Sequence, residues 1–417
     1  MSDRLEFPDG VVRVTPLTGV TDTDSISLAT ILDAQHLQSA LITSFIIDMD
    51  WLLSHLLPHT PLTLIADQTK HIDSSLHQNI TWCNPEFVVP DVQIMHTKLM
   101  LLVYTTHVRF VISTGNLVPE EWTVVQNSVF IQDFPLDYTR VFAANEFSTS
   151  LALSLHDLSV PFGVVARLNH VDFARARARI VTTVPTGGNR VNANMESYGM
   201  LRLAHVISQS TKAEEWEPDA RLYCIGSSLG KLNTNWLRDF YMCAHGWEPQ
   251  SLTLDARASI VPASMIDIAV AFPTHSEVTS NVYGKPAMQY VMAKQNVYAN
   301  PKFPKSCMFR VQPRTDRTVV HAKAIVARTG ERQNCGWVYL GSHNFTPAAW
   351  GRLRRGESPY YNNYEMGVVL LDVRYECRSQ NCVSRIVWEN TNVVLPFSPV
   401  WVPYGRTDAP YFNPNIQ

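Results

Sequence analysis

Two histidine–lysine pairs, one in each half of the chain, constrain the fold of this sequence more than any other feature. The first is His96-Thr97-Lys98 and the second is His321-Ala322-Lys323. An apolar run follows each pair, then a polar turn, a second apolar run and an asparagine, which is Asn116 in the first copy and Asn344 in the second. These apolar runs separated by a turn predict a strand hairpin in each half.

Each predicted hairpin gathers its polar residues at one point. A histidine and a lysine two apart on a strand face the same side of the sheet, and the returning strand brings the asparagine back beside them. Asn116 lies 18 residues after Lys98, and Asn344 lies 21 residues after Lys323, a difference that a longer turn absorbs. We therefore interpret the two copies as half-sites of one catalytic centre.

The length and composition are those of a compact globular protein. The 417 residues, of which 46% are hydrophobic and 17% charged, are enough for two domains with a core each. No apolar run approaches the roughly 20 residues of a membrane span, and the N-terminus lacks the layout of a secretory signal. The net charge of −3 argues against coating nucleic acid through bulk charge, although a local basic groove would not show in this total.

The cysteines indicate reduced thiols rather than a disulfide or zinc framework. Their number is odd and their spacings match no zinc signature, so we expect an intracellular protein with mostly buried thiols, without a metal site and without a cofactor. They lie at positions 83, 224, 243, 307, 335, 377 and 382.

Alternating strands and helices predict an α/β fold of two similar lobes related by a pseudo-twofold axis. Each lobe would hold a mixed β-sheet sandwiched between helices, with one half-site in each. We place the boundary so that residues 1–178 form the N-terminal lobe and residues 179–417 the C-terminal lobe. The stretch 138–179 is expected to be mainly helical, and the proline-rich tail beyond Leu395 to lie on the surface without regular structure.

Two histidines, two lysines and two asparagines at one point suit a phosphodiester substrate. Ammonium and amide groups donate to the non-bridging phosphate oxygens. One imidazole can attack phosphorus and form a phosphohistidine, while the other protonates the leaving oxygen and later activates water. Each imidazole needs a partner on its second nitrogen, so a carboxylate or amide is expected near each. No metal is required, because the cationic side chains take its place.

The doubled hairpin resembles the phospholipase D superfamily. Ordinary members carry an aspartate five residues after the lysine, where this sequence has Val103 and Arg328. The sequence is instead similar to the tyrosyl-DNA phosphodiesterases, in which a distant asparagine replaces that aspartate. The similarity extends weakly over nearly the whole chain and is carried by His96-Thr97-Lys98-Leu99-Met100-Leu101-Leu102, Thr114-Gly115-Asn116-Leu117, Trp122, the run from Ser342 to Gly351, and Tyr364-Glu365-Met366-Gly367-Val368.

This resemblance implies a role for each residue of the doubled motif. His96 would be the nucleophile and His321 the general acid and base. Glu365 corresponds to a carboxylate that orients a catalytic histidine, here His96; a surface ion pair is its alternative role. For the family's glutamine that orients the other histidine, ungapped counting gives Asn127, while Gln126 is the adjacent chemical match. The phosphate would be held by Lys98, Asn116, Lys323 and Asn344.

Contacts to DNA are also implied. Phe45 stands where the family often has a tyrosine, and its ring would either stack on a base or belong to the core. Ser228 with Gly230 in one loop, and Thr346 in another, are candidates for phosphate contacts, with turn formation as the alternative role for the two hydroxyls. A basic stretch before the second motif is expected to line the route of nucleic acid or peptide; it comprises Lys302, Lys305, Arg310, Arg314 and Arg317.

The implied function is that of a metal-independent DNA-repair phosphodiesterase. It would remove tyrosyl and other adducts, including peptides of trapped topoisomerase I, from the 3′ ends of single-stranded or nicked DNA through a phosphohistidine. A monomer in the nucleus is expected from the resemblance alone, because Arg352, Arg354 and Arg355 are too few for a nuclear-import signal. Two alternatives stay open: a phospholipase D-like phosphodiesterase acting on lipid or general nucleic acid, and an inactive nucleic-acid-binding scaffold.

Overall fold

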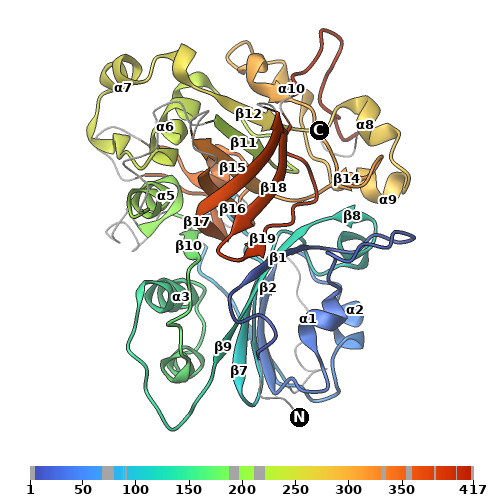
Figure 1. Ribbon diagram of the computed structural model, residues 1–417, viewed down its shortest axis with the longest axis vertical. Helices are drawn as coiled ribbons and strands as arrows, with labels where there is room; N and C mark the ends of the chain where they lie inside the picture. Colours follow the sequence, from blue (N-terminus) through green and yellow to red (C-terminus); the bar gives the residue numbers. More distant parts are fainter. Residues whose placement is uncertain are drawn as a thin grey trace.

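The computed structural model describes residues 5–67, 79–87, 89, 92–186, 197–210, 221–329, 335–353, 359–379, 382–400 and 402–414, without the side chains of residues 250, 329, 377–379 and 382–384. Its strands form two large mixed sheets that follow one another along the long axis of the molecule (Figure 1). Strands from the N-terminal part of the chain occupy one end and strands from the C-terminal part occupy the other.

The first sheet contains the first predicted hairpin. Over the described residues it has seven strands in the order β1-β9-β7-β6-β2-β3-β4. β6 and β7 are antiparallel, with Leu99 opposite Ile112, whereas β2, β3 and β4 run parallel. The strands are β1 (Val11–Val14), β2 (Ser39–Ser44), β3 (Leu62–Ala66), β4 (Ile80–Cys83), β6 (Leu99–Val103), β7 (His107–Ser113) and β9 (Ser128–Pro135).

The second sheet contains the second predicted hairpin, formed by β15 and β16 with Ala324 opposite Leu340. Its main path through the described chain is β13-β12-β11-β15-β16-β17-β18-β19, and β10 and β5 add to β17. The strands are β5 (Ile94–Met95), β10 (Arg179–Thr183), β11 (Arg221–Ile225), β12 (Ile268–Ala271), β13 (Met308–Phe309), β15 (Ala324–Thr329), β16 (Cys335–Gly341), β17 (Asn363–Ser379), β18 (Cys382–Trp388) and β19 (Thr391–Asn392).

Polar side chains fix where the helices begin. Asp48 accepts from the N–H of Trp51 at the start of α2, and Asn145 forms a capping box at the start of α3. The α-helices are α1 (Leu28–Leu32), α2 (Met49–Ser54), α3 (Glu146–Asp157), α4 (Phe162–Ala166), α5 (Gly199–Ser208), α6 (Thr234–Ala244), α7 (Leu254–Ile260), α8 (His275–Thr279), α9 (Lys285–Met288), α10 (Gln295–Tyr298) and α11 (Pro347–Trp350). The 3₁₀-helices include η2 (Pro119–Trp122), η3 (Arg167–His170), η7 (Pro249–Ser251), η8 (Ala263–Met265) and η9 (Lys305–Cys307).

The two sheets share a central core. Phe147 and Leu151 of α3 lie four apart, on one face of the helix, and belong to a buried cluster with Phe110 of the first sheet and Val368 of the second. Helices α1 and α2 pack on the other face of the first sheet, and α5 and α6 pack on the second. The order of layers is therefore helix, sheet, helix, sheet, helix, and the predicted α/β fold with sheets sandwiched between helices is confirmed.

Two short strands cross between the halves of the chain. β5, which leads into His96, pairs in parallel with β17. β14 (Val319–Val320), which leads into His321, pairs in parallel with β8 (Val125–Gln126). The strand before each histidine is thus anchored on the half of the chain that carries the other histidine. Because β5 joins the second sheet from within residues 1–178, the boundary between residues 178 and 179 stays a prediction.

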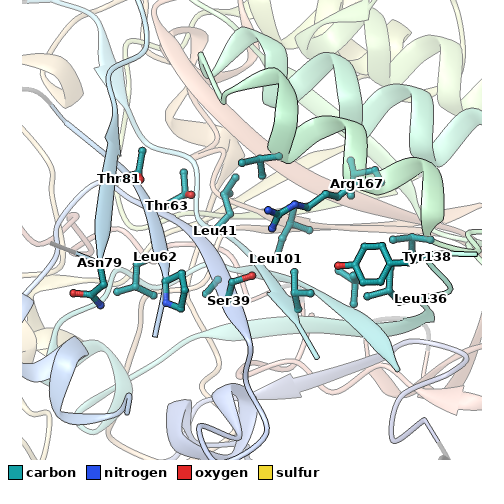
Figure 2. A pocket seen from close by; sticks show the side chains of 17 residues that line it. Ser39, Leu41, Leu62, Thr63, Asn79, Thr81, Leu101, Leu136, Tyr138 and Arg167 are labelled. Atoms are coloured by element: carbon teal, nitrogen blue, oxygen red, sulfur yellow. The ribbon is translucent and has the colours of Figure 1, made fainter. Parts of the chain in front are cut away.

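A cavity of about 200 Å³ lies over one face of the first sheet. Its floor includes Leu41 of β2 and Leu101 of β6, and Arg167 and Tyr138 reach over these strands from the helical side (Figure 2). None of the predicted site residues lines it. This cavity is therefore separate from the half-sites.

The structure also bears on the predictions about cysteines and membranes. The described cysteines at positions 83, 224, 243 and 307 are buried free thiols, as expected, and Cys335 is also buried. The side chains of Cys377 and Cys382 lie outside the described residues. In the part of the chain that the structure describes, no helix has both the length and the apolar character needed to cross a membrane.

Candidate active site

The two hairpins have equivalent backbone hydrogen bonds at their lysines. The N–H of Ser113 donates to the carbonyl of Lys98 at 3.1 Å, and the N–H of Gly341 donates to the carbonyl of Lys323 at 3.2 Å. The segments that carry Asn116 and Asn344 begin directly after these bonds. Both predicted hairpins are confirmed, and each returns its asparagine to the neighbourhood of its lysine.

His96 is held by a carboxylate from the other half of the chain. Its backbone N–H donates to the carbonyl of Tyr364 at 2.9 Å, and its Nδ1 lies 2.8 Å from Oε2 of Glu365. A carboxylate only accepts, so Nδ1 carries the proton and Nε2 keeps its lone pair. Glu365 is 1% exposed and accepts further bonds from the hydroxyl of Ser342 and from Nδ2 of Asn363. Glu365 is therefore a buried partner of His96, and its alternative as a surface ion pair is wrong.

His321 is held in the same way by an amide. Its backbone N–H donates to the carbonyl of Gln126 at 2.9 Å, and its Nδ1 lies 3.1 Å from Oδ1 of Asn127. The hydroxyl of Thr114 also donates to this oxygen, while Nδ2 of Asn127 donates to the carbonyl of Glu121, which fixes the amide orientation. Oε1 of Gln126 is buried without a hydrogen-bond partner. Of the two candidates, Asn127 is the one whose side chain contacts His321.

Glu121 is a further residue of the site, and no sequence motif indicates it. It lies in η2, is fully buried, and its Oε2 is 3.0 Å from Nδ1 of His321. The same carboxylate accepts from the backbone N–H and from Nδ2 of Asn116, both at 2.6 Å. Nothing in the sequence distinguishes Glu121 from its neighbour Glu120, because both fall in a short polar turn. Only its position five residues after a predicted site asparagine hinted at a role.

The two lysines join the half-sites. Nζ of Lys98 donates to the carbonyl of His96 at 2.7 Å, and Nζ of Lys323 donates to the carbonyl of His321 at 2.8 Å. Nζ of Lys323 also lies 3.1 Å from Nδ1 and 3.0 Å from Nε2 of His321, and it donates to the carbonyl of Thr114 in the other half at 3.1 Å. The charge of each lysine also acts on both histidines, so the histidines and lysines of the two halves lie in one neighbourhood.

Burial and mutual repulsion disfavour the cationic forms at this site. Burial lowers the pKa of Lys98 to about 8, and burial with the nearby charge of Lys98 lowers the pKa of Lys323 well below its usual value. Burial lowers the pKa of His321 to about 4, against the attraction of Glu121, and also lowers that of His96. Both imidazoles are therefore neutral at pH 7 in the absence of substrate.

The carboxylates behave in the opposite way. Burial alone would raise their pKa values, but the attraction of His96 and a hydrogen bond from it hold the pKa of Glu365 at about 2. The attraction of His321, its hydrogen bond and the charge of Lys323 likewise hold the pKa of Glu121 at about 2. Each imidazole therefore faces an ionised carboxylate.

The predicted DNA contacts gather beside Asn344 and His96. Oδ1 of Asn344 accepts from the N–H groups of Ser227 and Ser228 at 2.9 and 3.1 Å, which leaves its Nδ2 as a donor. A side chain at Gly230 would meet Thr346 at 2.7 Å, and Thr346 caps α11 through its hydroxyl, as its alternative role required. Phe45 is half-buried, and its ring centroid lies 5.5 Å from that of His96.

The basic stretch before the second motif is largely engaged elsewhere. Arg310 pairs with Asp408 at 2.7 Å and Arg314 pairs with Asp24 at 2.6 Å. Arg317 donates to the carbonyl of Ser280, while Lys302 and Lys305 are exposed. The expected route of nucleic acid along this stretch stays a prediction, and Arg354 and Arg355 lie outside the described residues. Among the described side chains, no group of three histidines, cysteines or carboxylates could hold a metal ion.

Comparison with known proteins identifies the family. A sequence model described as tyrosyl-DNA phosphodiesterase matches residues 12–405. The chain belongs to this family. Tyrosyl-DNA phosphodiesterase 1 of Arabidopsis thaliana is 22% identical over 424 residues, which are 94% of this chain and 66% of that protein. Tyrosyl-DNA phosphodiesterase 1 of Drosophila melanogaster is 25% identical over 444 residues, which are 96% of this chain and 73% of that protein.

A solved structure supports the fold independently. The crystal structure of the yeast tyrosyl-DNA phosphodiesterase matches with a TM-score of 0.75 and 17% identity, covering 97% of this chain and 99% of that chain. Membership of the tyrosyl-DNA phosphodiesterase family confirms the resemblance. It also confirms the expectation that the protein is a hydrolase, a DNA-repair phosphodiesterase whose general class of substrate is DNA.

Proposed function

We propose that the protein hydrolyses 3′-phosphotyrosyl and other 3′-end adducts of DNA, including peptides left by trapped topoisomerase I, without a metal and through a phosphohistidine. One observation carries the proposal. Two buried imidazoles each have Nδ1 held by an acceptor from the opposite half of the chain, and buried lysines lie beside them. This arrangement directs the Nε2 of each histidine to a phosphorus between them, and Nζ of Lys323 lies 3.0 Å from the Nε2 of His321.

The first step uses His96 as the nucleophile. Its Nε2 attacks phosphorus, and the bond from phosphorus to the tyrosyl oxygen breaks. His321 donates its Nε2 proton to that oxygen, so the peptide leaves with a neutral phenol. The DNA is then joined to His96 through a P–N bond, and the carboxylate of Glu365 stabilises the positive charge on the phosphorylated ring.

The second step uses His321 as the base. Now neutral, it takes a proton from water at Nε2, and the water oxygen attacks phosphorus as the P–N bond breaks. The products are DNA with a 3′-phosphate and neutral His96, and His321 is again protonated. Lys98, Lys323, Asn116 and Asn344 bind the non-bridging oxygens and stabilise the charge that develops on them.

Substrate binding supplies the charge that this cycle needs. His321 is neutral in the free protein because burial and the lysines disfavour imidazolium. A bound phosphodiester brings a negative charge into a site with two buried lysines, and this charge favours protonation of His321. The acid would therefore form only when DNA is in place.

Residues next to the site are proposed to contact the phosphates and a base of the DNA. Ser228, Gly230 and Thr346 lie beside Asn344 and are proposed to contact phosphates of single-stranded DNA. Phe45, half-buried against His96, is proposed to stack on a base. Action as a monomer in the nucleus is proposed on family likeness.

The decisive experiment uses an oligonucleotide with a 3′-phosphotyrosyl end in excess chelator. The expected product is a 3′-phosphate at an undiminished rate, with no turnover of a phosphatidylcholine vesicle or of an oligonucleotide with an unmodified 3′ end. Absence of product, or its loss with chelator, would reject the proposal.

Two variants test the assigned roles. His321→Asn should leave protein attached to DNA, because formation of the P–N bond survives better than its hydrolysis. His96→Ala should form no adduct, because it lacks the nucleophile. Trapping of the adduct by the His96 variant would reverse the assignment.

A further inference from the structure

Glu121 occupies a place that the internal symmetry of the site does not account for. The residue after Tyr364 is Glu365, whose carboxylate holds His96, and the residue after Gln126 is Asn127, whose amide holds His321. Glu365 and Asn127 are therefore equivalent positions, and the second one lacks a charge. The carboxylate that faces His321 comes instead from η2.

The position of Glu121 is built in rather than incidental. Its carbonyl accepts from Nδ2 of Asn127 at 2.8 Å, and the indole N–H of Trp122 donates to the carbonyl of Asn116 at 2.8 Å. The carboxylate accepts from both N–H groups of Asn116 at 2.6 Å and approaches Nδ1 of His321 at 3.0 Å. One anion thus connects a proposed phosphate ligand with the proposed general acid and base.

We infer that Glu121 is a positioning residue that raises the basicity of His321 and so drives hydrolysis of the phosphohistidine. This inference rests on the proposed function. When His321 takes a proton from water, its ring becomes cationic while Nδ1 donates to the acceptors beside it. The amide of Asn127 fixes the ring and its tautomer, and the carboxylate of Glu121 stabilises the charge.

The groups around His321 make this effect specific to Glu121. Lys323 and Lys98 face the ring as cations and oppose its protonation. Tyr290 places its ring centroid 5.5 Å away, and its hydroxyl lies 3.5 Å from a carboxylate oxygen of Glu120. Among the described residues that contact the ring, Glu121 is the anion. Its removal would leave two cations unopposed there.

The test separates formation of the adduct from its breakdown. Glu121→Gln in the full chain, with 3′-phosphotyrosyl DNA under single turnover, should slow breakdown about 10- to 100-fold while adduct formation falls much less, so the protein–DNA adduct accumulates. The acid limb of the breakdown rate should move to lower pH, because His321 becomes a weaker base. Glu121→Asp keeps the charge and should restore part of the breakdown rate and most of the pH profile.

Glu120→Gln is the matched control, since it removes the same charge one residue away and should leave both steps and the profile unchanged. Equal loss of both steps in Glu121→Gln with an unmoved acid limb would show a merely structural role and overturn the inference, as would breakdown at the wild-type rate. If the wild-type protein itself fails to process the substrate, the proposed function fails instead.

Discussion

At the scale of single residues, the site holds charges where burial opposes them. Lys98 and Lys323 are 2% and 0% exposed, and each lowers the stability of the other's charged form in an interior that solvates ions poorly. The ionised carboxylates of Glu121 and Glu365 offset the charge of the lysines, but each of them faces a histidine. Under the proposed function, the phosphate of the substrate is the anion that lies between these lysines.

Inorganic phosphate should fill that place and stabilise the fold. Because ligands that bind only the folded state raise stability by mass action, a concentration 100 times the dissociation constant should add about 2.7 kcal/mol to the free energy of unfolding. The measurement is the thermal midpoint in phosphate against chloride at equal ionic strength and pH. Lys323→Met should lose this gain, whereas Lys302→Met, at an exposed position, should retain it. An equal gain in both variants would contradict a site between the buried lysines.

The residues that sequence could predict are those whose spacing carries a signal. The His-x-Lys pairs and their asparagines recur at matched intervals, so the doubled motif was predictable, and Glu365 followed from the resemblance. The sequence could not decide between Gln126 and Asn127. That choice depends on the backbone N–H of His321 bonding to the carbonyl of Gln126, which places the side chain of the next residue, Asn127, at the imidazole. Glu121 was hidden for the same reason: its partner is 200 positions away in the sequence.

At the scale of elements, the second half-site depends on close contact between two strands. Gly341 of β16 lies opposite Gly367 of β17, and the ring of Tyr339 lies across both, so that a Cβ on Gly367 would meet it at 2.3 Å. The flanking residues Ser342 and Met366 are hydrogen-bonded and lead to Asn344 and Glu365. The paired glycines thus set how closely these two site residues approach.

Gly367→Ala should therefore destabilise the protein by about 1–3 kcal/mol, because the added methyl overlaps a buried ring. Gly163→Ala is the control: this position in α4 has nothing within 4 Å of an added Cβ, and alanine there should stabilise by about 0.5–1 kcal/mol through its helix propensity. Urea unfolding followed by circular dichroism measures both changes. Similar stability of Gly367→Ala and wild type would show that the strands can separate without cost.

The elements that sequence could predict are long or strongly apolar. The strands of the two hairpins were predicted, because each hairpin consists of two apolar runs separated by a polar turn. The prediction of mainly helical structure over 138–179 was right for α3, α4 and η3. It was wrong before Asn145, where the capping box starts the helix, and after His170, where the chain has no helix before β10 begins at Arg179. The two-residue strands β5, β8 and β14 have no periodicity, since only their partners elsewhere in the chain define them.

At the scale of the whole molecule, the buried site makes folding sensitive to acid. The folded-state pKa of His321 is about 4, below its usual 6.5, so the unfolded chain binds the extra proton as the pH falls from 6.5 to 4 and stability declines. Glu121 and Glu365 have folded pKa values of about 2, below 4.5, so stability is lost again as the pH falls from 4.5 to 2.

The free energy of unfolding in urea should accordingly fall by on the order of 3 kcal/mol between pH 7 and pH 4 from His321 alone, at about 1.4 kcal/mol per pKa unit. His321→Asn should have a flatter profile over this range, and His36→Asn, an exposed histidine, should keep the wild-type slope. A flat wild-type profile from pH 7 to pH 4 would mean that His321 titrates normally in the folded protein.

The strands β5 and β14 give the molecule an interlocked construction. His96, the proposed nucleophile, is aligned by the backbone and carboxylate of the other half, and His321, the proposed acid, is aligned by the backbone and amide of the first half. In a chain that is still being synthesised, or in which one sheet is unfolded, neither histidine would have the contacts that orient it. Under the proposed function, only the fully folded protein would react with DNA. An incompletely folded molecule would therefore not form a covalent adduct with DNA that it cannot hydrolyse.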